Sequence, residues 1–478
     1  MDSRTSHPKP RRPKSSTARS DGARPAGHRR PKAQPAEASL PAGLAARQAA
    51  VLILETILDR YEPLDRAQDV QAARLDRLEA RDRGFALNLV RVVLRRLLFL
   101  GAAVDRLIER PLPPEARRVR HILLVAAAQI CELGTPPHAA VSLAVEQCRR
   151  DRGVRRFDKL VNAVLRRVAA SAELVATTWD RHAGDIPPWL FARWIATFGE
   201  VTARRIAAAS LVRAPLDLSV KADPERWAAE LGATLLPTGS LRLADAGAVQ
   251  ELAGYASGDW WVQDAAAALP VGLLGAISGL AVADLCAAPG GKTAQLAAGG
   301  ARVTAVDNSA SRVSRLIENL TRLNLSAQVD VVTAEIETWA PAGTFDAVLL
   351  DAPCTATGTL RRHPDILHLK SAQDIVRLAE TQARLLRHAA HHVRPGGMLV
   401  YCTCSLETEE GAHQIDRFLV ETPAFSRIPV ATHEIGGQPE WITPAGDLRT
   451  LPFHLSNPEP GLAGIDGFYA ARLRRRQD

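Results

Sequence analysis

The sequence has no uninterrupted apolar run of about eighteen residues, so we expect no membrane span. Its basic N-terminus is not followed by the apolar core of a signal peptide, which argues against export. Only six of the 478 residues are cysteines, and their spacing does not suggest a disulfide framework. These absences predict a cytoplasmic protein in a reducing compartment, without a membrane partner.

Positive charge is in excess: 60 lysines and arginines face 52 acidic residues, for a formal net charge of +8. Several arginines stand side by side, as in Arg149–Arg150. Guanidinium groups bind phosphate well, which is compatible with an anionic polymer as partner. A GC-rich genome, which enriches arginine and alanine together, explains any single pair equally well. The charge alone therefore identifies no partner.

The length of the chain predicts two or three domains, because one hydrophobic core rarely serves so many residues. Residues 1–40 are rich in Pro, Ser, Lys and Arg, and we expect a disordered basic tail there. Residues 41–170 carry apolar side chains at three- to four-residue spacing, which predicts an all-helical domain. In residues 171–262 we expect one linker helix, from Pro187 to about Leu211, and then a small α+β module.

In residues 263–478 apolar strands alternate with helices, which predicts a doubly wound parallel sheet. The strands that we expect are Ala281–Cys286, Arg302–Asp307, Gln328–Thr333, Thr344–Leu350 and Met398–Thr403. Ligands of such sheets bind at the carboxyl ends of the strands. The residues of this region that are suited to chemistry all fall at such ends.

The first of these strands runs into a loop of small residues and then a helix. The loop and helix start consist of Cys286, Ala287, Ala288, Pro289, Gly290, Gly291 and Lys292. A phosphate-binding P-loop requires glycine at position 286, where a cysteine stands, and the dinucleotide fingerprint G-x-G-x-x-G is absent. The remaining alternative is the loop that holds S-adenosylmethionine in a methyltransferase.

Acidic residues at the next two strand ends favour the methyltransferase alternative. Asp307 stands 21 positions after Cys286, where a carboxylate accepts hydrogen bonds from ribose hydroxyls. Capping of a helix is the other role open to Asp307, although Asn308 or Ser309 would fill that role equally well. Glu335 ends the third strand, where a side-chain acceptor reaches the adenine amino group. We therefore predict S-adenosylmethionine as the cofactor.

The fourth and fifth strand ends bring a carboxylate and thiols toward the cofactor. Asp351 precedes Pro353–Cys354, and the fifth strand ends at Cys402 and Cys404. A metal site is the first alternative, but Cys-x-Cys with one further cysteine and no suitably spaced histidine is a poor zinc pattern. We therefore expect no metal, and we expect Cys402 to be a buried structural thiol.

Together these motifs resemble the Sun/Nop2 family of RNA cytosine-C5 methyltransferases. The likeness spans about residues 40 to 475 and is most similar to the bacterial branch that acts on small-subunit ribosomal RNA. It is carried by Cys286–Thr293, Asp351–Cys354, Arg361–Asp365 and Thr403–Ser405, while Lys159–Arg167 resembles the last helix of the NusB-like RNA-binding fold. Two positions depart from the family pattern: Glu335 stands where Asp is usual, and Gly411 where Asn is common.

The resemblance implies an all-α NusB-like domain, a small α+β module and an α/β Rossmann-like (class I) methyltransferase domain. It implies 16S ribosomal RNA as partner, with Cys404 as the nucleophile at cytosine C6 and Cys354 assisting release of the product. DNA cytosine methyltransferases instead use the cysteine of the Pro-Cys motif, so the cysteine pair distinguishes the RNA family.

Other roles follow from the chemistry of the side chains. Asp351 is suited to hydrogen-bond the N3 edge of cytosine. Lys292 is expected to position Asp351 or the substrate, or else to be a surface lysine at a helix start. Arg361–His363 are candidates for binding RNA phosphate. A catalytically retired RNA-binding scaffold, a DNA methyltransferase and a P-loop NTPase remain the competing hypotheses, and nothing in the sequence demands more than a monomer.

Overall fold

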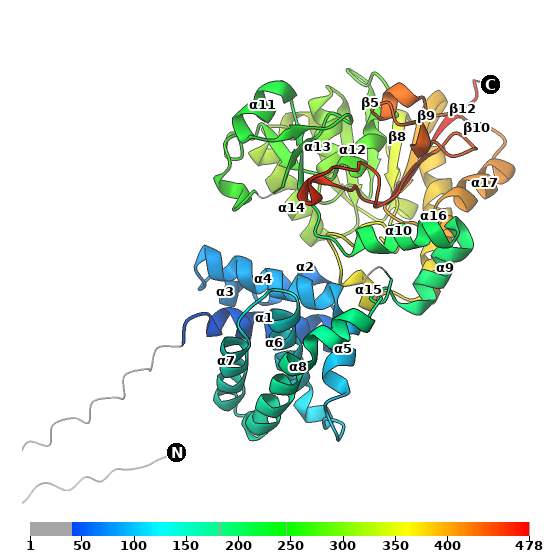
Figure 1. The fold of residues 1–478 in the computed structure, drawn as a ribbon. Helices are drawn as coiled ribbons and strands as arrows, with labels where there is room; N and C mark the ends of the chain where they lie inside the picture. Colours follow the sequence, from blue (N-terminus) through cyan, green and yellow to red (C-terminus); the bar gives the residue numbers. More distant parts are fainter. Residues whose placement is uncertain (1–40, 181–182, 245, 478) are drawn as a thin grey trace, which may run out of the picture. The chain divides into compact units, whose positions relative to one another are not determined.

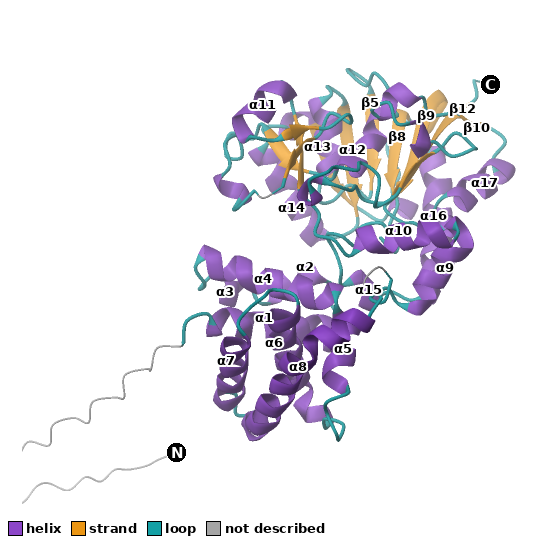
Figure 2. Ribbon diagram, in the orientation of Figure 1, coloured by secondary structure: helices purple, strands orange, loops and turns teal. Residues whose placement is uncertain are grey.

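The structure is a computed structural model that describes residues 41–180, 183–244 and 246–477 (Figure 1). The predicted tail, residues 1–40, lies outside the described residues. In the described part of the chain, residues 44–178 form helices and the turns between them, and the first strand begins at Leu216 (Figure 2). None of the helices in the described part combines the length and apolarity that crossing a bilayer requires.

The helical part packs around one hydrophobic core, in which Ile53, Leu94, Leu123 and Leu165 are completely buried. This arrangement confirms the predicted all-helical domain. Its helices are α1 (Leu44–Arg60), α2 (Leu64–Val70), α3 (Ala72–Leu75), α4 (Ala80–Arg95), α5 (Leu97–Asp105), α6 (Arg117–Cys131), α7 (Pro137–Arg150) and α8 (Asp158–Thr178).

The segment after the helical core contains two helices where the sequence predicts one. Helices α9 (Pro188–Phe198) and α10 (Glu200–Ser210) meet at Gly199, whose φ of 78° is outside the helical region and is readily adopted only by glycine. The single-helix prediction is therefore wrong at this residue. A small antiparallel sheet with the order β2-β3-β1-β4 follows. It consists of β1 (Leu216–Val220), β2 (Thr234–Leu235), β3 (Leu241–Leu243) and β4 (Trp260–Val262), with α11 (Pro224–Leu231) between β1 and β2.

The large sheet has the order β10-β12-β9-β8-β5-β6-β7, with β11 paired to β12. The five strands from β9 to β7 are parallel, as the sequence predicts, while β10, β11 and β12 pair antiparallel at one edge and were not predicted. The strands are β5 (Ala281–Leu285), β6 (Arg302–Asp307), β7 (Val329–Thr333), β8 (Phe345–Asp351), β9 (Val393–Thr403), β10 (Phe425–Arg427), β11 (Leu448–Thr450) and β12 (Phe468–Arg475).

Helices cover both faces of the large sheet because successive side chains of its strands point to opposite sides. Leu349 packs in one core with helices α12–α14, whereas its neighbour Leu350 packs in the other with α16 and α17. The helices of this part are α12 (Ala265–Gly272), α13 (Gly291–Ala298), α14 (Ala310–Arg322), α15 (Ile366–Leu369), α16 (Ala372–His391) and α17 (Ala412–Glu421). The parallel strands therefore present their carboxyl ends along one edge, where ligands of this fold class bind.

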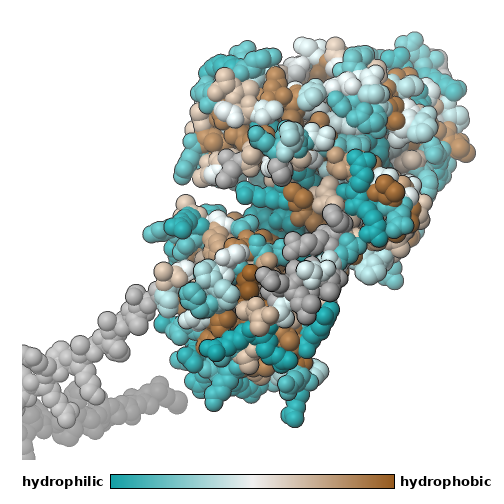
Figure 3. Space-filling view, in the orientation of Figure 1, coloured by the Kyte–Doolittle hydropathy of each residue, from teal (hydrophilic) through white to brown (hydrophobic). Residues whose placement is uncertain are grey.

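Hydrophobic side chains that remain exposed are spread over the chain, for example Tyr61 in the helical part, Val201 in α10 and Val420 in α17. On the face drawn in Figure 3 they are interspersed with hydrophilic side chains and do not gather into one patch there. Cavities lined by polar groups are therefore the better candidates for the functional site.

Candidate active site

A cavity of about 310 Å³ lies at the carboxyl ends of the parallel strands. Its walls come from the ends of β5, β6 and β8, from the segment after β7, from the residues after β9 and from helix α16. Among the residues that line it are Cys286, Ala288, Asp307, Glu335, Asp351, Cys354 and Cys404. Five separate segments thus bring seven of the residues predicted from sequence to one place, and α16 completes the wall.

The loop between β5 and α13 adopts a backbone that few residue types tolerate. Cys286 has a φ of 61°, and Gly290, which precedes the helix, has a φ of 103°. A Cβ atom on Gly290 would lie only 3.1 Å from the Leu316 side chain, so glycine is needed there both for the angle and for the space. The backbone N–H of Ala288 donates to Asp307 at 3.2 Å, which fixes the loop beside the end of β6.

Asp307 is almost completely buried at the end of β6 and is held from three directions. Oδ1 accepts the Ser309 N–H at 2.9 Å and pairs with Arg312 at 3.0 Å, while the one donor to Oδ2 from the described residues is the Ala288 N–H. Since a carboxylate oxygen accepts two hydrogen bonds, Oδ2 keeps one acceptor position. Asp307 does not cap α14 through its side chain; Ser309 does, by accepting the Arg312 N–H. The capping alternative for Asp307 is therefore wrong.

Glu335 lies at the rim of the same cavity and is exposed. The amide of Asn308 donates to both of its carboxylate oxygens, at 3.2 and 3.1 Å. Asn308 directly follows Asp307 in the chain, so the two acidic side chains are linked through adjacent residues. This link was not predicted from the sequence, in which Asn308 is only a candidate for capping the next helix.

Lys292, in the first turn of α13, is buried and donates from Nζ to Asp351 Oδ2 at 2.7 Å. Burial, the largest single effect, lowers the pKa of Lys292. The charge and hydrogen bond of Asp351, together with Cys402 and Cys404, outweigh it and hold that pKa above its usual value. Asp351 also accepts from the Cys402 thiol, whose sulfur lies 3.5 Å from Oδ1. Of the alternatives for Lys292, this geometry favours positioning of Asp351 over a surface lysine.

The thiols of Cys354 and Cys404 face each other, with their sulfur atoms 3.5 Å apart. The hydrogen bond with Cys404, together with burial, raises the pKa of the Cys354 thiol well above its usual value. Cys354 is therefore protonated at neutral pH and can donate its S–H toward the Cys404 sulfur. Among the described residues, Lys292 and Arg362 each interact electrostatically with Cys404.

Glu410 connects the two cysteine-bearing loops, and sequence reasoning missed it. Its completely buried carboxylate accepts the backbone N–H of Thr355 at 2.9 Å and the hydroxyl of Ser405 at 2.5 Å. It also accepts the Thr355 hydroxyl and, at 3.1 Å, the side-chain amide of Gln382 in α16. The available signal was weak: two consecutive glutamates that follow Cys404 by a few residues.

Some predicted residues lie outside the lining of the cavity. Ala287, Pro289, Gly290 and Gly291 belong to the loop behind it, and Lys292 reaches it through Asp351. Arg361 is buried and donates to the backbone oxygen of Ala463, and Arg362 is bonded to Asp466. Both arginines thus make structural bonds. In the described residues no group of three or more His, Cys, Asp or Glu side chains is placed to hold a metal ion.

Comparison with known proteins decides which methyltransferase family this geometry represents. Residues 274–474 match the family described as 16S rRNA methyltransferase RsmB/F, and residues 44–170 match the NusB family. The chain is 33% identical over 447 residues to a ribosomal RNA small subunit methyltransferase B of Klebsiella pneumoniae (strain 342), covering 90% of this chain and 98% of the relative. It is 36% identical over 446 residues, with the same coverage, to the protein of that name from Xylella fastidiosa (strain Temecula1).

This chain belongs to the RsmB/F methyltransferase family. The predicted resemblance and the predicted order of a NusB-like domain and a Rossmann-like methyltransferase domain are thereby confirmed. As a member of the RsmB/F family the protein is an S-adenosylmethionine-dependent methyltransferase. The residue-level assignments of the site and the limits of the domains stay predictions.

Solved structures agree on the fold of this family member. The crystal structure of PH0851 superposes with a TM-score of 0.72 at 22% identity, over 91% of this chain and 99% of that one. NSun6 from Pyrococcus horikoshii, solved with SFG, gives a TM-score of 0.52 at 19% identity over 61% of this chain and 99% of its own. At these identities the likeness concerns the fold alone.

Proposed function

We propose that this protein transfers a methyl group from S-adenosylmethionine to C5 of a cytosine in 16S ribosomal RNA, through a covalent adduct between Cys404 and C6. The 3.5 Å separation of the Cys354 and Cys404 sulfurs, beside Asp351 and the cofactor cavity, carries this proposal. The names of the Klebsiella and Xylella relatives support ribosomal RNA as the substrate class.

The cofactor cavity fits S-adenosylmethionine by its donor set. The free acceptor position on Asp307 suits the ribose hydroxyls, and the exposed carboxylate of Glu335 suits the adenine amino group. The loop from Cys286 to Gly291 would lie along the methionine part. When bound, the cofactor supplies an electrophilic methyl group. Asp307 repels a 2′-phosphate, so a phosphorylated dinucleotide is disfavoured at this position.

The residues of this chain prepare the base. Cytosine C5 is a weak nucleophile, and addition of the Cys404 sulfur to C6 forms an S–C6 bond that moves an electron pair toward C5. Asp351 is held by Lys292 and Cys402. When it carries or shares a proton, it is placed to donate a hydrogen bond to the N3 edge and so stabilise the negative charge that develops there. After methylation, water takes up the C5 proton, the C5–H bonding pair re-forms the ring double bond, and the S–C6 pair returns to Cys404.

Cys354 acts in the last step, in which the S–C6 bond breaks and the product is released. Because its pKa is raised, its thiol keeps a proton and donates a hydrogen bond to the departing Cys404 sulfur. That hydrogen bond stabilises the thiolate as the S–C6 bond breaks. Loss of Cys354 should therefore slow release more than addition, and the covalent adduct should accumulate.

The experiment uses small-subunit ribosomal RNA from cells that lack this gene, cofactor labelled in its methyl group, and four proteins: wild type, Cys404→Ala, Cys354→Ala and Cys131→Ala. Cys131 lies in α6 of the helical part and serves as the matched control. We expect label in 5-methylcytosine with wild type and Cys131→Ala, none with Cys404→Ala, and a denaturation-resistant protein–RNA adduct with Cys354→Ala. Full activity of Cys404→Ala would refute the assignment of the nucleophile.

Two further measurements address the competing functions. Duplex DNA of the matching sequence should receive no label, whereas labelling of DNA in preference to RNA would identify a DNA methyltransferase. Failure of the wild-type protein to bind S-adenosylmethionine would identify a retired scaffold. We also propose that the protein acts as a cytoplasmic monomer. Sedimentation of the protein at working concentration tests the monomer.

A further inference from the structure

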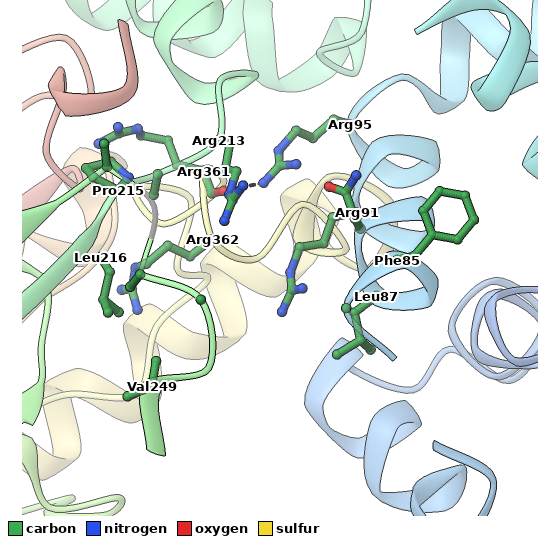
Figure 4. Close-up of a pocket in the computed structure, with 16 residues that line it drawn as sticks. Phe85, Leu87, Arg91, Arg95, Arg213, Pro215, Leu216, Val249, Arg361 and Arg362 are labelled. Carbon is green, nitrogen blue, oxygen red and sulfur yellow. Dashed lines mark hydrogen bonds between the residues drawn. The ribbon is translucent and has the colours of Figure 1, made fainter. Parts of the chain in front are cut away.

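A second cavity, of about 660 Å³, is lined by arginines from three separate segments. Arg91 and Arg95 extend from α4, and Arg213 belongs to the segment between α10 and β1 (Figure 4). Arg361 and Arg362 belong to the loop between β8 and α15, residues 352–365, which also carries Cys354 and is called the Cys354 loop. None of the sixteen described residues that line this arginine pocket carries a carboxylate. The pocket therefore concentrates positive charge.

The arginines of the pocket repel one another. Burial first, and then the like charges of Arg91, Arg213 and Arg361, lower the pKa of Arg95 to about 10. Burial also lowers the pKa of Arg91, and the charge of Arg213 lowers it further. The charges of Asp65 and Asp365 act in the opposite direction. An anion in the pocket would relieve this repulsion.

One of the arginines that line the pocket has a hydrogen-bond donor without a partner. Arg95 is buried and donates to the backbone oxygen of Arg361 at 2.8 Å, but its Nε has no partner among the described residues. A buried guanidinium N–H without an acceptor is costly and calls for an explanation, of which a bound anion or water is one. The unpartnered Nε of Arg95 thus adds a second sign of an anion site to the repulsion between the arginines.

From these observations we infer that the arginine pocket binds phosphodiester groups of the RNA strand that carries the target cytosine, an inference that rests on the proposed function. Apolar residues, among them Leu87, Pro215 and Val249, lie beside the arginines and offer surface for sugars or bases. A pocket with both kinds of wall suits a polynucleotide strand better than a free inorganic anion.

The arginine pocket is continuous with the active site along the chain. Cys354 and Arg361 belong to one loop, and Arg362, which lines the pocket, interacts electrostatically with Cys404. The loop is also fixed to the helical part, since Asp365 accepts the Leu64 N–H at 3.0 Å and Arg95 bonds Arg361. A strand held in the pocket is thereby held next to the cysteines.

The test compares the double variant Arg91→Gln/Arg213→Gln with the matched control Arg106→Gln/Arg110→Gln, whose two arginines are exposed in the helical part outside the pocket. Affinity for a single-stranded fragment of small-subunit ribosomal RNA is measured over a salt series, alongside kcat, KM for RNA and binding of S-adenosylmethionine. Inorganic phosphate alone is titrated as a competitor.

We expect the pocket variant to bind RNA about tenfold more weakly, and the slope of log K against log salt to fall by about 0.7 for each phosphate that the protein no longer neutralises. Its KM for RNA should rise while kcat at saturating RNA and cofactor affinity stay close to wild type. The inference is overturned if the control loses as much affinity, if neither variant loses any, or if phosphate competes for the pocket while RNA affinity is unchanged by the substitutions. A wild-type protein that methylates no RNA would instead remove the proposed function.

Discussion

The Ser405 hydroxyl donates to the Glu410 carboxylate at 2.5 Å. Ser405 directly follows Cys404, and Thr355, which donates to the same carboxylate, directly follows Cys354. One buried side chain thus determines where both thiols stand. Burial raises the pKa of Glu410, although the hydrogen bonds from Ser405 and Thr355 oppose that effect.

Glu410→Gln keeps the shape of the side chain but replaces one carboxylate oxygen by an amide N–H₂. This donor would then face the groups that donate hydrogen bonds to Glu410. We expect kcat to fall about a hundredfold and the free energy of unfolding to fall by about 1–3 kcal/mol, the range for an unsatisfied buried donor. Because Glu410 acts through the cysteine loops, KM for the cofactor should not change, and alkylation of Cys404 by iodoacetamide should change rate. Glu421→Gln, at an exposed pair with Arg387, is the control. Equal kcat in both variants would show that Glu410 positions nothing.

Lys292→Met removes the cation that faces Asp351. We expect kcat to fall about a hundredfold, because Asp351 loses the partner that orients it, and Lys292→Arg to recover part of the loss. Since the Asp351 side chain is about a third exposed, the stability cost should be modest, about 1–3 kcal/mol rather than that of a fully buried pair. Methyl-transfer kinetics measure the fall in kcat, and thermal unfolding measures the loss of stability. Lys159→Met, at an exposed position, is the control, and matching behaviour of the two variants would mean that Lys292 does not position Asp351.

Asp284, at the buried centre of β5, should give a distinctive pH dependence of stability. Burial raises its pKa to about 7, despite a hydrogen bond of 2.6 Å from Thr293. A raised folded-state pKa contributes stability below pH 4 that is lost as the pH rises through about 7, by at most about 1.4 kcal/mol per pH unit. Asp284→Asn should therefore gain stability relative to wild type between pH 5 and pH 8, as measured by urea unfolding.

Asp346 provides a control of opposite sign for this pH series. The Ala281 N–H and Arg394 lower its pKa, so its contribution is present above pH 4 and is lost as the pH falls. Asp346→Asn should differ from wild type above pH 4 and converge with it in acid. A flat difference between wild type and Asp284→Asn across pH 5–8 would contradict the raised pKa of Asp284.

Arg242 fastens the small sheet to the C-terminal segment. It is 1% exposed, donates to both oxygens of Asp217 at 2.7 Å, and also donates to the backbone oxygens of Leu462 and Gly464. Arg242→Ala leaves Asp217 buried without its cation, so the free energy of unfolding should fall by about 3–5 kcal/mol. Arg226→Ala, which breaks the exposed pair with Glu230, should cost less than about 1 kcal/mol. Similar losses in the two variants would refute this account.

The parallel core of the catalytic sheet could be predicted because each of its strands has a local signal. Strands β5 to β9 are short apolar runs separated by helical patterns, and Arg302–Asp307 was predicted with its observed bounds. Strand β12 has no such signal, since it ends in arginines and is defined by antiparallel pairing with β9 across a long stretch of chain. The break at Gly199 was missed because apolar spacing continues on both sides of it.

The residues of the candidate site also fall into those that the sequence predicts and those that it does not. Residues at strand ends, such as Asp307, Asp351 and Cys404, follow from topology, because parallel strands bring their carboxyl ends together. Glu410 and Arg91 do not, since their roles depend on contacts between segments remote in sequence. No local sequence pattern identifies a buried carboxylate that accepts hydrogen bonds from two loops. The arginine pocket likewise forms only where α4 packs against the Cys354 loop.

The shared anchoring of Cys354 and Cys404 has a consequence for the order of events. With both sulfurs held 3.5 Å apart before any substrate arrives, a base delivered to one is delivered to the other. The RNA therefore needs to bind only once for the S–C6 bond to form and to break. The protein does not have to rearrange between these two steps.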